Sequence, residues 1–313
     1  MRTISRFGGK TNYKYQLMMN KQINFIMKKL VKSVENVIFL MLALFVSFVI
    51  LQIFFFSTFK IPSDSMSPAL EAGDNVLVCK AIIGPRLFNI FVSLRNEQTK
   101  IYRLPGLKKI QRNDVLVFNF PCPNNWETIE MHILKYYVKR CIGLPGDSLS
   151  IKNGLFHIEG YQGILGNRLS QIKIQDREKK DFEDGVFHCF PYDSTLCWNI
   201  KDFGALYIPK AGTSILLDRQ NFLLYKKLIE WEQQEHLYYR DTSVYLKNKK
   251  IDTYQFQKNY YFMAGDNGEN SQDSRYWGLL PEEYIVGKAW IVWKSIDPYT
   301  GKIRWKRLFN LVN

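Results

Sequence analysis

The stretch Ile61-Pro-Ser-Asp-Ser-Met-Ser-Pro68 places three serines, Ser63, Ser65 and Ser67, between two prolines. Each proline fixes its own φ and biases the residue before it away from the helical region, so Ser65 is expected on a stiff, extended or turning segment. A hydroxyl held in this way is consistent with a nucleophile, and equally with an ordinary polar loop, because Ser and Pro are common in loops for local reasons. The choice depends on whether the rest of the chain supplies a base and an oxyanion site.

An apolar run from Val37 to Phe56, interrupted only by Ser47 and Gln52, almost directly precedes this stretch. About twenty helical residues span about 30 Å, the thickness of a bilayer core. A cleaved signal peptide has a shorter apolar segment and a small-residue cleavage site. We therefore predict a permanent transmembrane helix at residues 37–56, with a buried core helix as the alternative.

The charge distribution suggests how this span is oriented. Eight basic residues and one acid, Glu35, precede residue 36, so about half of the net charge of +14 lies before the apolar run. A basic balance is compatible with nucleic acid or anionic lipid, but the remaining charge is spread thinly and forms no recognisable nucleic-acid module. The positive-inside rule predicts a cytoplasmic segment at 1–36 and an extracytoplasmic domain at 57–313, with the lipid bilayer and not nucleic acid as partner.

Five cysteines stand at positions 79, 122, 141, 189 and 197, and an odd count beyond a membrane does not indicate a disulfide framework. Spacing leaves open whether Cys189 and Cys197 close a small loop. Cys79 and Cys141 lie in apolar stretches, so we expect both to be small buried side chains. No CxxC or HxxxH pair has metal-ligand spacing, and neither a metal nor another cofactor is predicted.

Past residue 60 the chain consists mostly of short β-type runs separated by turns, which favours an antiparallel barrel or packed sheets. Asn153-Gly154 is the strongest hairpin signal, because a type I′ turn needs positive φ at both positions. Residues 159–203 are polar and irregular and are interpreted as an insertion. Residues 218–236 have helical apolar spacing, with Asp218 as N-cap. The predicted strand runs are 74–78, 113–120, 136–142, 148–158, 260–263 and 286–293.

Lys139 lies in the middle of an apolar strand run and is the candidate base for Ser65. Most strand lysines point to solvent. Burial, however, lowers the lysine pKa from about 10.4 toward neutrality, where a neutral amine can take a proton from serine. The four histidines, at positions 132, 157, 188 and 236, do not lie in a convincing triad context, and a Ser/Lys pair needs none.

Five sequence blocks follow the apolar run in order: Ile61-Pro-Ser-Asp-Ser-Met-Ser-Pro-Ala-Leu70, Gly73-Asp-Asn-Val-Leu-Val78, Arg112-Asn-Asp-Val-Leu-Val-Phe118, Tyr137-Val-Lys-Arg-Cys-Ile-Gly-Leu-Pro-Gly-Asp147 and Gly265-Asp-Asn-Gly-Glu-Asn-Ser-Gln-Asp-Ser-Arg-Tyr-Trp-Gly278. Each block alone is a modest signal. All five in this order, after one span with its N-terminus inside, resemble the signature blocks of bacterial type I signal peptidases (leader peptidases). The resemblance covers the anchor and most of residues 60–158 and 205–293, but not the insertion.

The resemblance implies a membrane-bound serine endopeptidase that removes N-terminal signal peptides from exported precursor proteins. It implies that Ser65 is the nucleophile and that Lys139 is the general base and later the acid. Ser63 would lend its hydroxyl to the oxyanion hole beside the backbone N–H of Ser65. Ser271 would orient the Lys139 amine through a hydrogen bond.

The resemblance also implies a structural ion pair between Asp273 and Arg275 behind the site. Small pockets in this family accept small side chains, typically alanine, one and three residues before the cut, and such pockets select by steric exclusion. The implied location is the bacterial inner membrane, with signal peptides and the protein export machinery as partners. The apolar cover of the dyad and the pocket lining are predicted from Ile61, Met66, Leu70 and Val138.

Two positions depart from the family pattern. Asp64 stands where many members have Gly or Ser. A carboxylate close to the site would raise the lysine pKa, but we expect Asp64 to point to water. Gly268-Glu269 replaces the more usual Arg-Asp of the last block, which affects one outer ion pair and not the dyad.

Two other classes of protein share part of this pattern. The self-cleaving repressors of the SOS response share a Ser/Lys β-domain, but they are soluble and carry a helix-turn-helix domain, which this chain does not resemble. A catalytically inactive, membrane-anchored β scaffold is the other alternative, and the intact serines and Lys139 argue against it. Met27-Lys28-Lys29 is as good a start of translation as Met1, so residues 1–26 are predicted to be an extension without its own fold.

Overall fold

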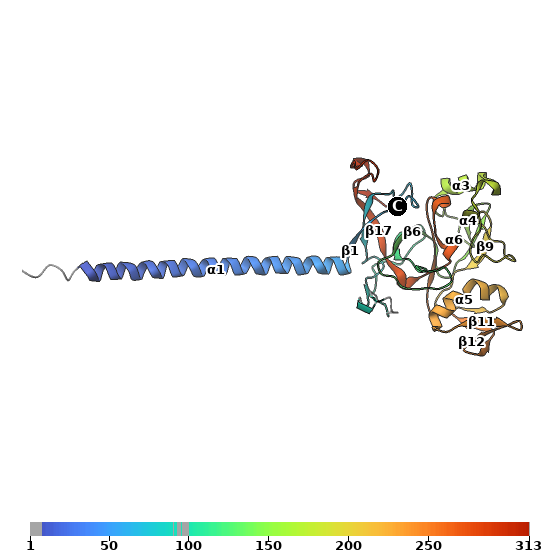
Figure 1. Ribbon diagram of the computed structural model, residues 1–313, viewed down its shortest axis with the longest axis horizontal. Helices are drawn as coiled ribbons and strands as arrows, with labels where there is room; N and C mark the ends of the chain where they lie inside the picture. The colour runs from blue at the N-terminus through green and yellow to red at the C-terminus, as the bar shows by residue number, and fades with distance from the viewer. Residues whose placement is uncertain (1–7, 90, 93–94, 96–99, 313) are drawn as a thin grey trace, which may run out of the picture. The chain divides into compact units, whose positions relative to one another are not determined.

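The chain, described by a computed structural model over residues 8–89, 91–92, 95 and 100–312, divides into two compact units, one up to Ile53 and the other from Phe54 onward. The described part of the first unit is helical and belongs to α1 (Gly8–Phe54), one unbroken helix whose last residue is assigned to the second unit (Figure 1). Within the described residues, its segment Met18–Phe54 is the one helix long and apolar enough to cross a membrane.

Residues 8–26 are helical and continue without a break into the apolar run. One sequence prediction about this helix needs correction. The helix ends at Phe54, and Phe56 already belongs to the first strand, so the predicted span of 37–56 is two residues too long at its C-terminal end.

The second unit is built around an eight-stranded antiparallel sheet, which confirms the prediction of a mainly β fold. Seven strands follow one path and the eighth, β18, pairs with β17. In path order the strands are β1 (Phe56–Lys60), β2 (Asp74–Cys79), β17 (Ile285–Ser295), β5 (Val115–Asn119), β6 (Tyr136–Gly143), β15 (Tyr260–Ala264) and β16 (Leu280–Pro281), with β18 at Asn310–Leu311. The sheet is curled into a half-barrel. It stays open, because the end strands β1 and β16 do not pair with each other.

Strand β5 shows how the sheet separates two apolar cores. All five of its residues are buried, so it lacks the alternation of a half-exposed strand. Val115 and Val117 face a smaller cluster that includes Met66. Leu116 and Phe118 face the larger cluster on the other side. Burial on both faces holds β5 and its neighbour β6 in a fixed register.

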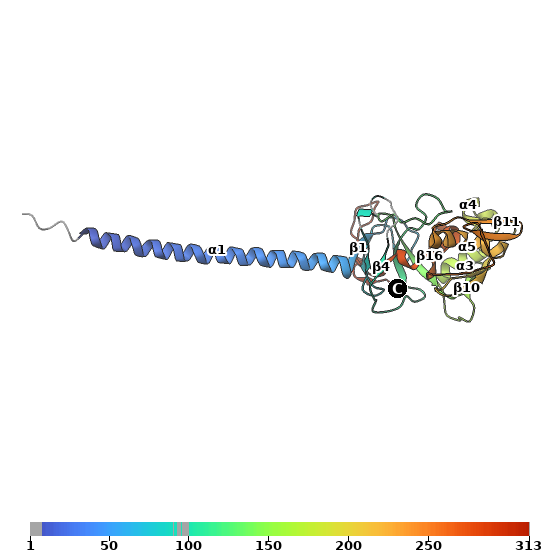
Figure 2. The ribbon, with the colours of Figure 1, turned by 90° about the horizontal axis from the view of Figure 1, so that it is seen from below.

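Smaller sheets and several helices complete the second unit, and Figures 1 and 2 both show α3, α5 and β11 grouped away from β1. The hairpin of β7 (Ser148–Lys152) and β8 (Leu155–Ile158) turns at Asn153 and Gly154, whose φ angles of 48° and 80° confirm the predicted turn signal. The remaining strands are β9 (Phe203–Tyr207), β3 (Arg86–Leu87), β4 (Tyr102–Arg103), β10 (Ser214–Leu216), β14 (Thr253–Gln255), β11 (Leu237–Arg240), β12 (Ser243–Leu246) and β13 (Lys249–Ile251).

Helix α5 (Arg219–Gln233) confirms the helix predicted at 218–236, because the Asp218 carboxylate accepts a hydrogen bond of 2.7 Å from the Asn221 N–H. It is not the only helix of this unit. Residues 159–203, predicted to be irregular, contain α3 (Arg168–Asp176) and α4 (Asp184–Phe187). Further short helices are η1 (Lys179–Asp181), η2 (Gly268–Asn270), α6 (Ser274–Trp277), η3 (Glu282–Tyr284) and η4 (Trp305–Arg307).

The insertion contributes residues to the apolar core and is not an exposed loop. Ile174 is 2% exposed, and Ile200 and Trp198 are buried in the larger cluster as well. Apolar residues spaced irregularly along a polar stretch hide this burial from a periodicity search. All five cysteines are free thiols, so Cys189 and Cys197 are not bridged, and Cys79 and Cys141 are buried as predicted.

Candidate active site

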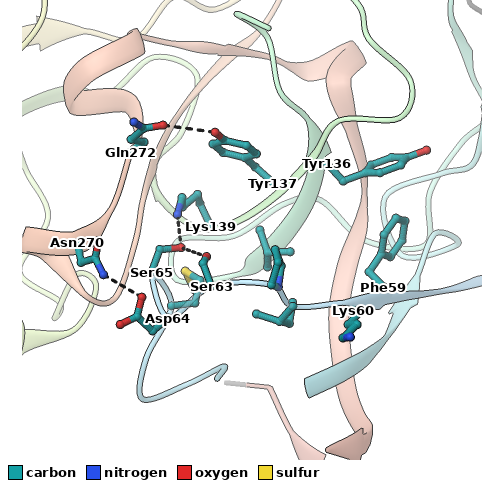
Figure 3. A pocket seen from close by; sticks show the side chains of 14 residues that line it. Phe59, Lys60, Ser63, Asp64, Ser65, Tyr136, Tyr137, Lys139, Asn270 and Gln272 are labelled. Carbon is teal, nitrogen blue, oxygen red and sulfur yellow. Dashed lines mark hydrogen bonds between the residues drawn. The ribbon is translucent and has the colours of Figure 1, made fainter. Parts of the chain in front are cut away.

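A cavity of about 410 Å³ lies beside the Ile61–Pro68 stretch. Its wall comes from three parts of the chain: residues 59–66 at the end of β1 and just after it, residues 136–139 at the start of β6, and the segment that carries Asn270 and Gln272. Figure 3 shows Ser65 between Lys139 and Ser63 in this wall. The cavity is therefore lined by residues from three of the five quoted sequence blocks, those that begin at Ile61, Tyr137 and Gly265.

The Nζ atom of Lys139 lies 2.5 Å from the Oγ atom of Ser65. Strand alternation allowed Lys139 to point either way, and the sheet turns it inward, where it is 3% exposed. Burial lowers the pKa of this amine to about 8, while the carboxylate of Asp273 raises it and the guanidinium of Arg275 lowers it again. A substantial fraction of the amine is therefore neutral close to physiological pH, and it is in contact with the hydroxyl of Ser65.

A buried ion pair lies close to the amine. Arg275 Nη2 is 2.7 Å from Asp273 Oδ2, and the two residues are 2% and 0% exposed. Burial would raise the pKa of the Asp273 carboxyl, but the charge and hydrogen bonds of Arg275 outweigh it and lower that pKa. Asp273 stays ionised, so it raises the pKa of Lys139 against the effect of burial.

Ser271 does not make the contact predicted for it. Its Oγ donates a hydrogen bond of 2.7 Å to Asp273 Oδ2, and no hydrogen bond joins it to Lys139 among the described residues. An ionised carboxylate that lies two residues away is a stronger acceptor than an amine that already contacts Ser65. Gly265 lets these groups meet, because a Cβ at that position would lie 2.5 Å from the carbonyl oxygen of Ser65 and collide with Ser271 Oγ.

Ser63 and Asp64 flank the candidate nucleophile in different ways. The hydroxyl of Ser63 lies 3.4 Å from Ser65 Oγ, a long contact that leaves it free to turn toward another acceptor. The carboxylate of Asp64 is exposed, as expected, but it also accepts a hydrogen bond of 2.9 Å from the side-chain amide of Asn270 (Figure 3). It raises the pKa of Lys139, with a smaller effect than burial.

Three of the four predicted pocket residues line the cavity: Ile61, Met66 and Val138. Leu70 does not; it is fully buried in the smaller cluster, because the turn from Met66 to Leu70 directs it into the core. The residues that the sequence prediction missed are Phe59, Lys60, Tyr136, Tyr137, Asn270 and Gln272. Tyr137, Asn270 and Gln272 lie within the quoted blocks, and the other three lie directly before a block, but nothing in local spacing marks these side chains as pocket residues.

A second ion pair, between Arg140 and Asp266, fixes β6 to the loop after β15. Arg140 donates two hydrogen bonds to the Asp266 carboxylate, at 2.7 and 2.6 Å, and a third to the carbonyl oxygen of Asn113 at 2.9 Å. A bidentate pair of this kind has little freedom to rotate. Because Arg140 follows Lys139 directly, this pair ties the strand segment that carries the candidate base to the loop after β15. Among the described residues, no group of three or more His, Cys, Asp or Glu side chains could hold a metal ion.

The chain is similar to known proteins over most of its length. The family model described as "Signal peptidase, peptidase S26" matches residues 32–294. The signal peptidase I of Buchnera aphidicola subsp. Schizaphis graminum is 31% identical over 320 residues, which cover 96% of this chain and 90% of that protein. The corresponding protein of Buchnera aphidicola subsp. Acyrthosiphon pisum is 30% identical over 293 residues, or 90% and 84% of the two chains. That of Pseudomonas aeruginosa is 29% identical over 256 residues, or 79% and 67%.

Proposed function

Because the chain belongs to the signal peptidase family, peptidase S26, we propose that Ser65 and Lys139 are the residues with which it removes signal peptides from precursor proteins. The observation that carries this proposal is the 2.5 Å separation between Lys139 Nζ and Ser65 Oγ in the wall of the cavity. A neutral amine at this distance can remove the hydroxyl proton without a histidine.

The first half of the reaction forms an ester. Lys139 Nζ accepts the proton while Ser65 Oγ forms a bond to the carbonyl carbon of the peptide bond to be cut. The carbonyl oxygen then carries the negative charge, and the Ser65 N–H and the Ser63 hydroxyl donate hydrogen bonds to it. No described backbone carbonyl accepts a hydrogen bond from the Ser65 N–H, so this donor is available. Each such donor typically contributes about 10²–10³ in rate.

The carbon–nitrogen bond then breaks as protonated Lys139 gives its proton to the leaving amine of the mature protein, which completes the ester on Ser65. The second half of the reaction restores the enzyme. Neutral Lys139 then takes a proton from water while the water oxygen attacks the ester carbon. The ester bond breaks, Ser65 Oγ regains a proton from Lys139, and the signal peptide leaves with a carboxylate end.

The cavity wall supports a preference for small residues before the cut, of the Ala-X-Ala type. Ile61, Met66 and Val138 line the cavity near Ser65. Ile61 and Met66 are 3% and 1% exposed, so neither can move aside for a large side chain. Exclusion by a rigid apolar wall discriminates by size and accepts alanine.

The chain is membrane-anchored, and we propose the bacterial inner membrane with the N-terminus in the cytoplasm. The eight basic residues before residue 36 and the candidate span at Met18–Phe54 support this orientation. The catalytic unit then faces the extracytoplasmic side, where it meets the lipid bilayer and precursors delivered by the export machinery. The inactive scaffold considered above has no support from the relatives, which are signal peptidases.

The test uses the full-length protein in detergent and a precursor that carries an Ala-X-Ala cleavage site. Ser65→Ala and Lys139→Ala should each lower cleavage at least about 10³-fold while the melting temperature stays within a few degrees of wild type. Lys152→Ala, which removes an exposed lysine of β7, is the matched control and should cleave at the wild-type rate. Near-normal processing by either dyad variant would overturn the proposal, and a wild-type protein with no activity would favour the inactive scaffold.

A further inference from the structure

The insertion at 159–203 contributes none of the described residues that line the catalytic cavity. Its helix α3 nevertheless packs against η2, the short turn of the last sequence block. The residues of η2 and its N-cap Asn267 also contact the Ile61–Pro68 stretch, which carries Ser65 and is called the nucleophile stretch below. The turn η2 therefore lies between the insertion and the candidate nucleophile.

Three contacts join α3 to η2. The Oγ atom of Ser170 accepts a hydrogen bond of 2.8 Å from the Gly268 N–H. Arg177, at the C-terminal end of α3, forms an ion pair with Glu269. Gly268 lies flush against the helix, because a Cβ there would lie 2.7 Å from Ile174 Cδ1. The contacts combine charge, a hydrogen bond and close packing at one surface.

Helix α3 is itself firmly held. The side chain of Asn167 caps its first turn by accepting hydrogen bonds from the N–H groups of Leu169 and Ser170. Lys201 Nζ donates to the carbonyl oxygens of Gln175 and Arg177, at 3.0 and 2.7 Å, and so satisfies the C-terminal end. The helix is therefore a rigid support and not a mobile flap.

Residues of η2 and its N-cap form hydrogen bonds with the nucleophile stretch on the side away from α3. The Asn267 N–H donates a hydrogen bond of 3.1 Å to the carbonyl oxygen of Ser65, and its side-chain amide lies 3.4 Å from the carbonyl oxygen of Asp64. Asn270 donates to the Asp64 carboxylate at 2.9 Å. The bond to Ser65 holds the peptide unit after it, while the Asp64 carbonyl before it has the longer amide contact and accepts a further hydrogen bond of 2.8 Å from the Ser67 N–H.

The planarity of the peptide bond links the contact at the Asp64 carbonyl oxygen to the reaction. In the trans peptide between Asp64 and Ser65, the carbonyl and the N–H point in opposite directions. Holding the Asp64 carbonyl therefore aims the Ser65 N–H, the proposed oxyanion donor. A shift of about 1 Å in such a group can lower a rate about 10²-fold.

We propose that α3 positions the reacting groups of Ser65 through η2, and that Ser170 and Arg177 are positioning residues of the peptidase reaction. This inference rests on the proposed role of Ser65. The Gly268-Glu269 pair, which departs from the family pattern, then has a physical explanation. Gly268 leaves room for Ile174, and Glu269 supplies the charge that Arg177 binds.

The first test is a charge exchange in the full-length protein. Arg177→Glu places two carboxylates against each other and should lower kcat about tenfold with KM within about twofold of wild type. The double variant Arg177→Glu/Glu269→Arg should restore kcat to within about threefold of wild type, because the pair re-forms with the charges exchanged. Lys258→Glu is the matched control, since the Lys258–Glu283 ion pair has similar exposure but lies away from the cavity; it should keep kcat within about twofold of wild type.

A steric exchange provides a second measurement if the charge variants fold poorly. Gly268→Ala should lower kcat because its Cβ meets Ile174 Cδ1, and Gly268→Ala/Ile174→Val should recover activity because valine lacks that atom. Ser170→Ala should lower kcat without moving the acid limb of the pH profile, since the environment of Lys139 is unchanged.

The outcomes separate this inference from the proposed function. If Ser65→Ala is inactive but Arg177→Glu, Gly268→Ala and Ser170→Ala all keep kcat within about twofold of wild type, the positioning role is wrong and the dyad stands. Lowered kcat with no recovery in either double variant would also overturn it. If Ser65→Ala remains active, the proposed function itself fails, and this inference with it.

Discussion

Asn270 Nδ2 donates a hydrogen bond of 2.9 Å to Asp64 Oδ1 and so holds a carboxylate in the wall of the cavity, on the residue that separates Ser63 from Ser65 in the chain. The sequence left Asp64 without a role. Its position gives it two physical effects: it ties the nucleophile stretch to the last block, and its negative charge raises the pKa of Lys139 against the larger effect of burial.

Replacing the Asp64 carboxylate should lower the pKa of Lys139 slightly. Asp64→Asn removes the negative charge, so the pKa of Lys139 should fall and the acid limb of kcat/KM should move to lower pH by a few tenths of a unit. The pH profile of cleavage measures this directly, with Asp252→Asn, an exposed acid of the same type, as control. A limb that moves to higher pH would contradict the electrostatic assignment.

The wild-type enzyme should lose activity as the solution becomes acidic. Protonated Lys139 cannot act as a base, and burial places its pKa at about 8, so kcat/KM should rise through about pH 8 and level off above it. The measurement is kcat/KM from pH 6 to pH 10 in one ionic strength. A flat profile across this range would rule out Lys139 as the base.

Lys139 should also be a source of instability that depends on pH. Its folded pKa of about 8 lies below the ordinary value of 10.5, so the unfolded chain binds more protons in this window and stability rises with pH from about 8 to 10.5. Lys139→Met should therefore melt at a higher temperature than wild type at pH 7, and the difference should shrink toward pH 10. Thermal unfolding of both proteins at several pH values checks this; equal differences at every pH would contradict it.

Breaking the buried ion pair should affect folding more than chemistry. Asp273→Asn leaves the guanidinium of Arg275 buried without its counter-charge, which should destabilise the catalytic unit by about 3–5 kcal/mol. Urea unfolding in detergent measures the loss. Lys258→Gln, which breaks a partly exposed ion pair, should cost about 1 kcal/mol or less. Similar losses for the two variants would show that the Asp273–Arg275 pair is not effectively buried.

Ser271 is expected to act through Asp273. Its hydroxyl donates to that carboxylate and not to the amine, so Ser271→Ala should lower kcat about tenfold, much less than Lys139→Ala. Steady-state cleavage by the two variants decides the point. A loss as large as that of Lys139→Ala would show that the hydroxyl turns to the amine during the reaction.

Much of the fold could be read from the chain because it depends on local patterns. The alternation and turn residues of 148–158 indicated a hairpin, and Asp218 indicated the start of α5; both are confirmed. The predicted family is confirmed as well. The catalytic roles of Ser65 and Lys139 stay predictions, now supported by the distance between their side chains.

The insertion marks the limit of such reading. Its helix α3 has only two buried residues, Gln171 and Ile174, too few for a clear apolar stripe. Leu70 failed as a pocket residue for a related reason: an apolar residue near a site can face the core as readily as the cavity. Composition and spacing do not distinguish these cases.

The sequence by itself determined the apolar span, the β-rich catalytic unit and the identity of the serine and lysine that the blocks single out. Only the tertiary structure decided that Lys139 points inward, that Ser271 turns to Asp273, and that Arg177 meets Glu269 across 92 positions of chain. The physical reason is the range of the interactions. Periodicity and turn chemistry act between near neighbours, whereas these contacts exist only once distant segments have packed into one unit.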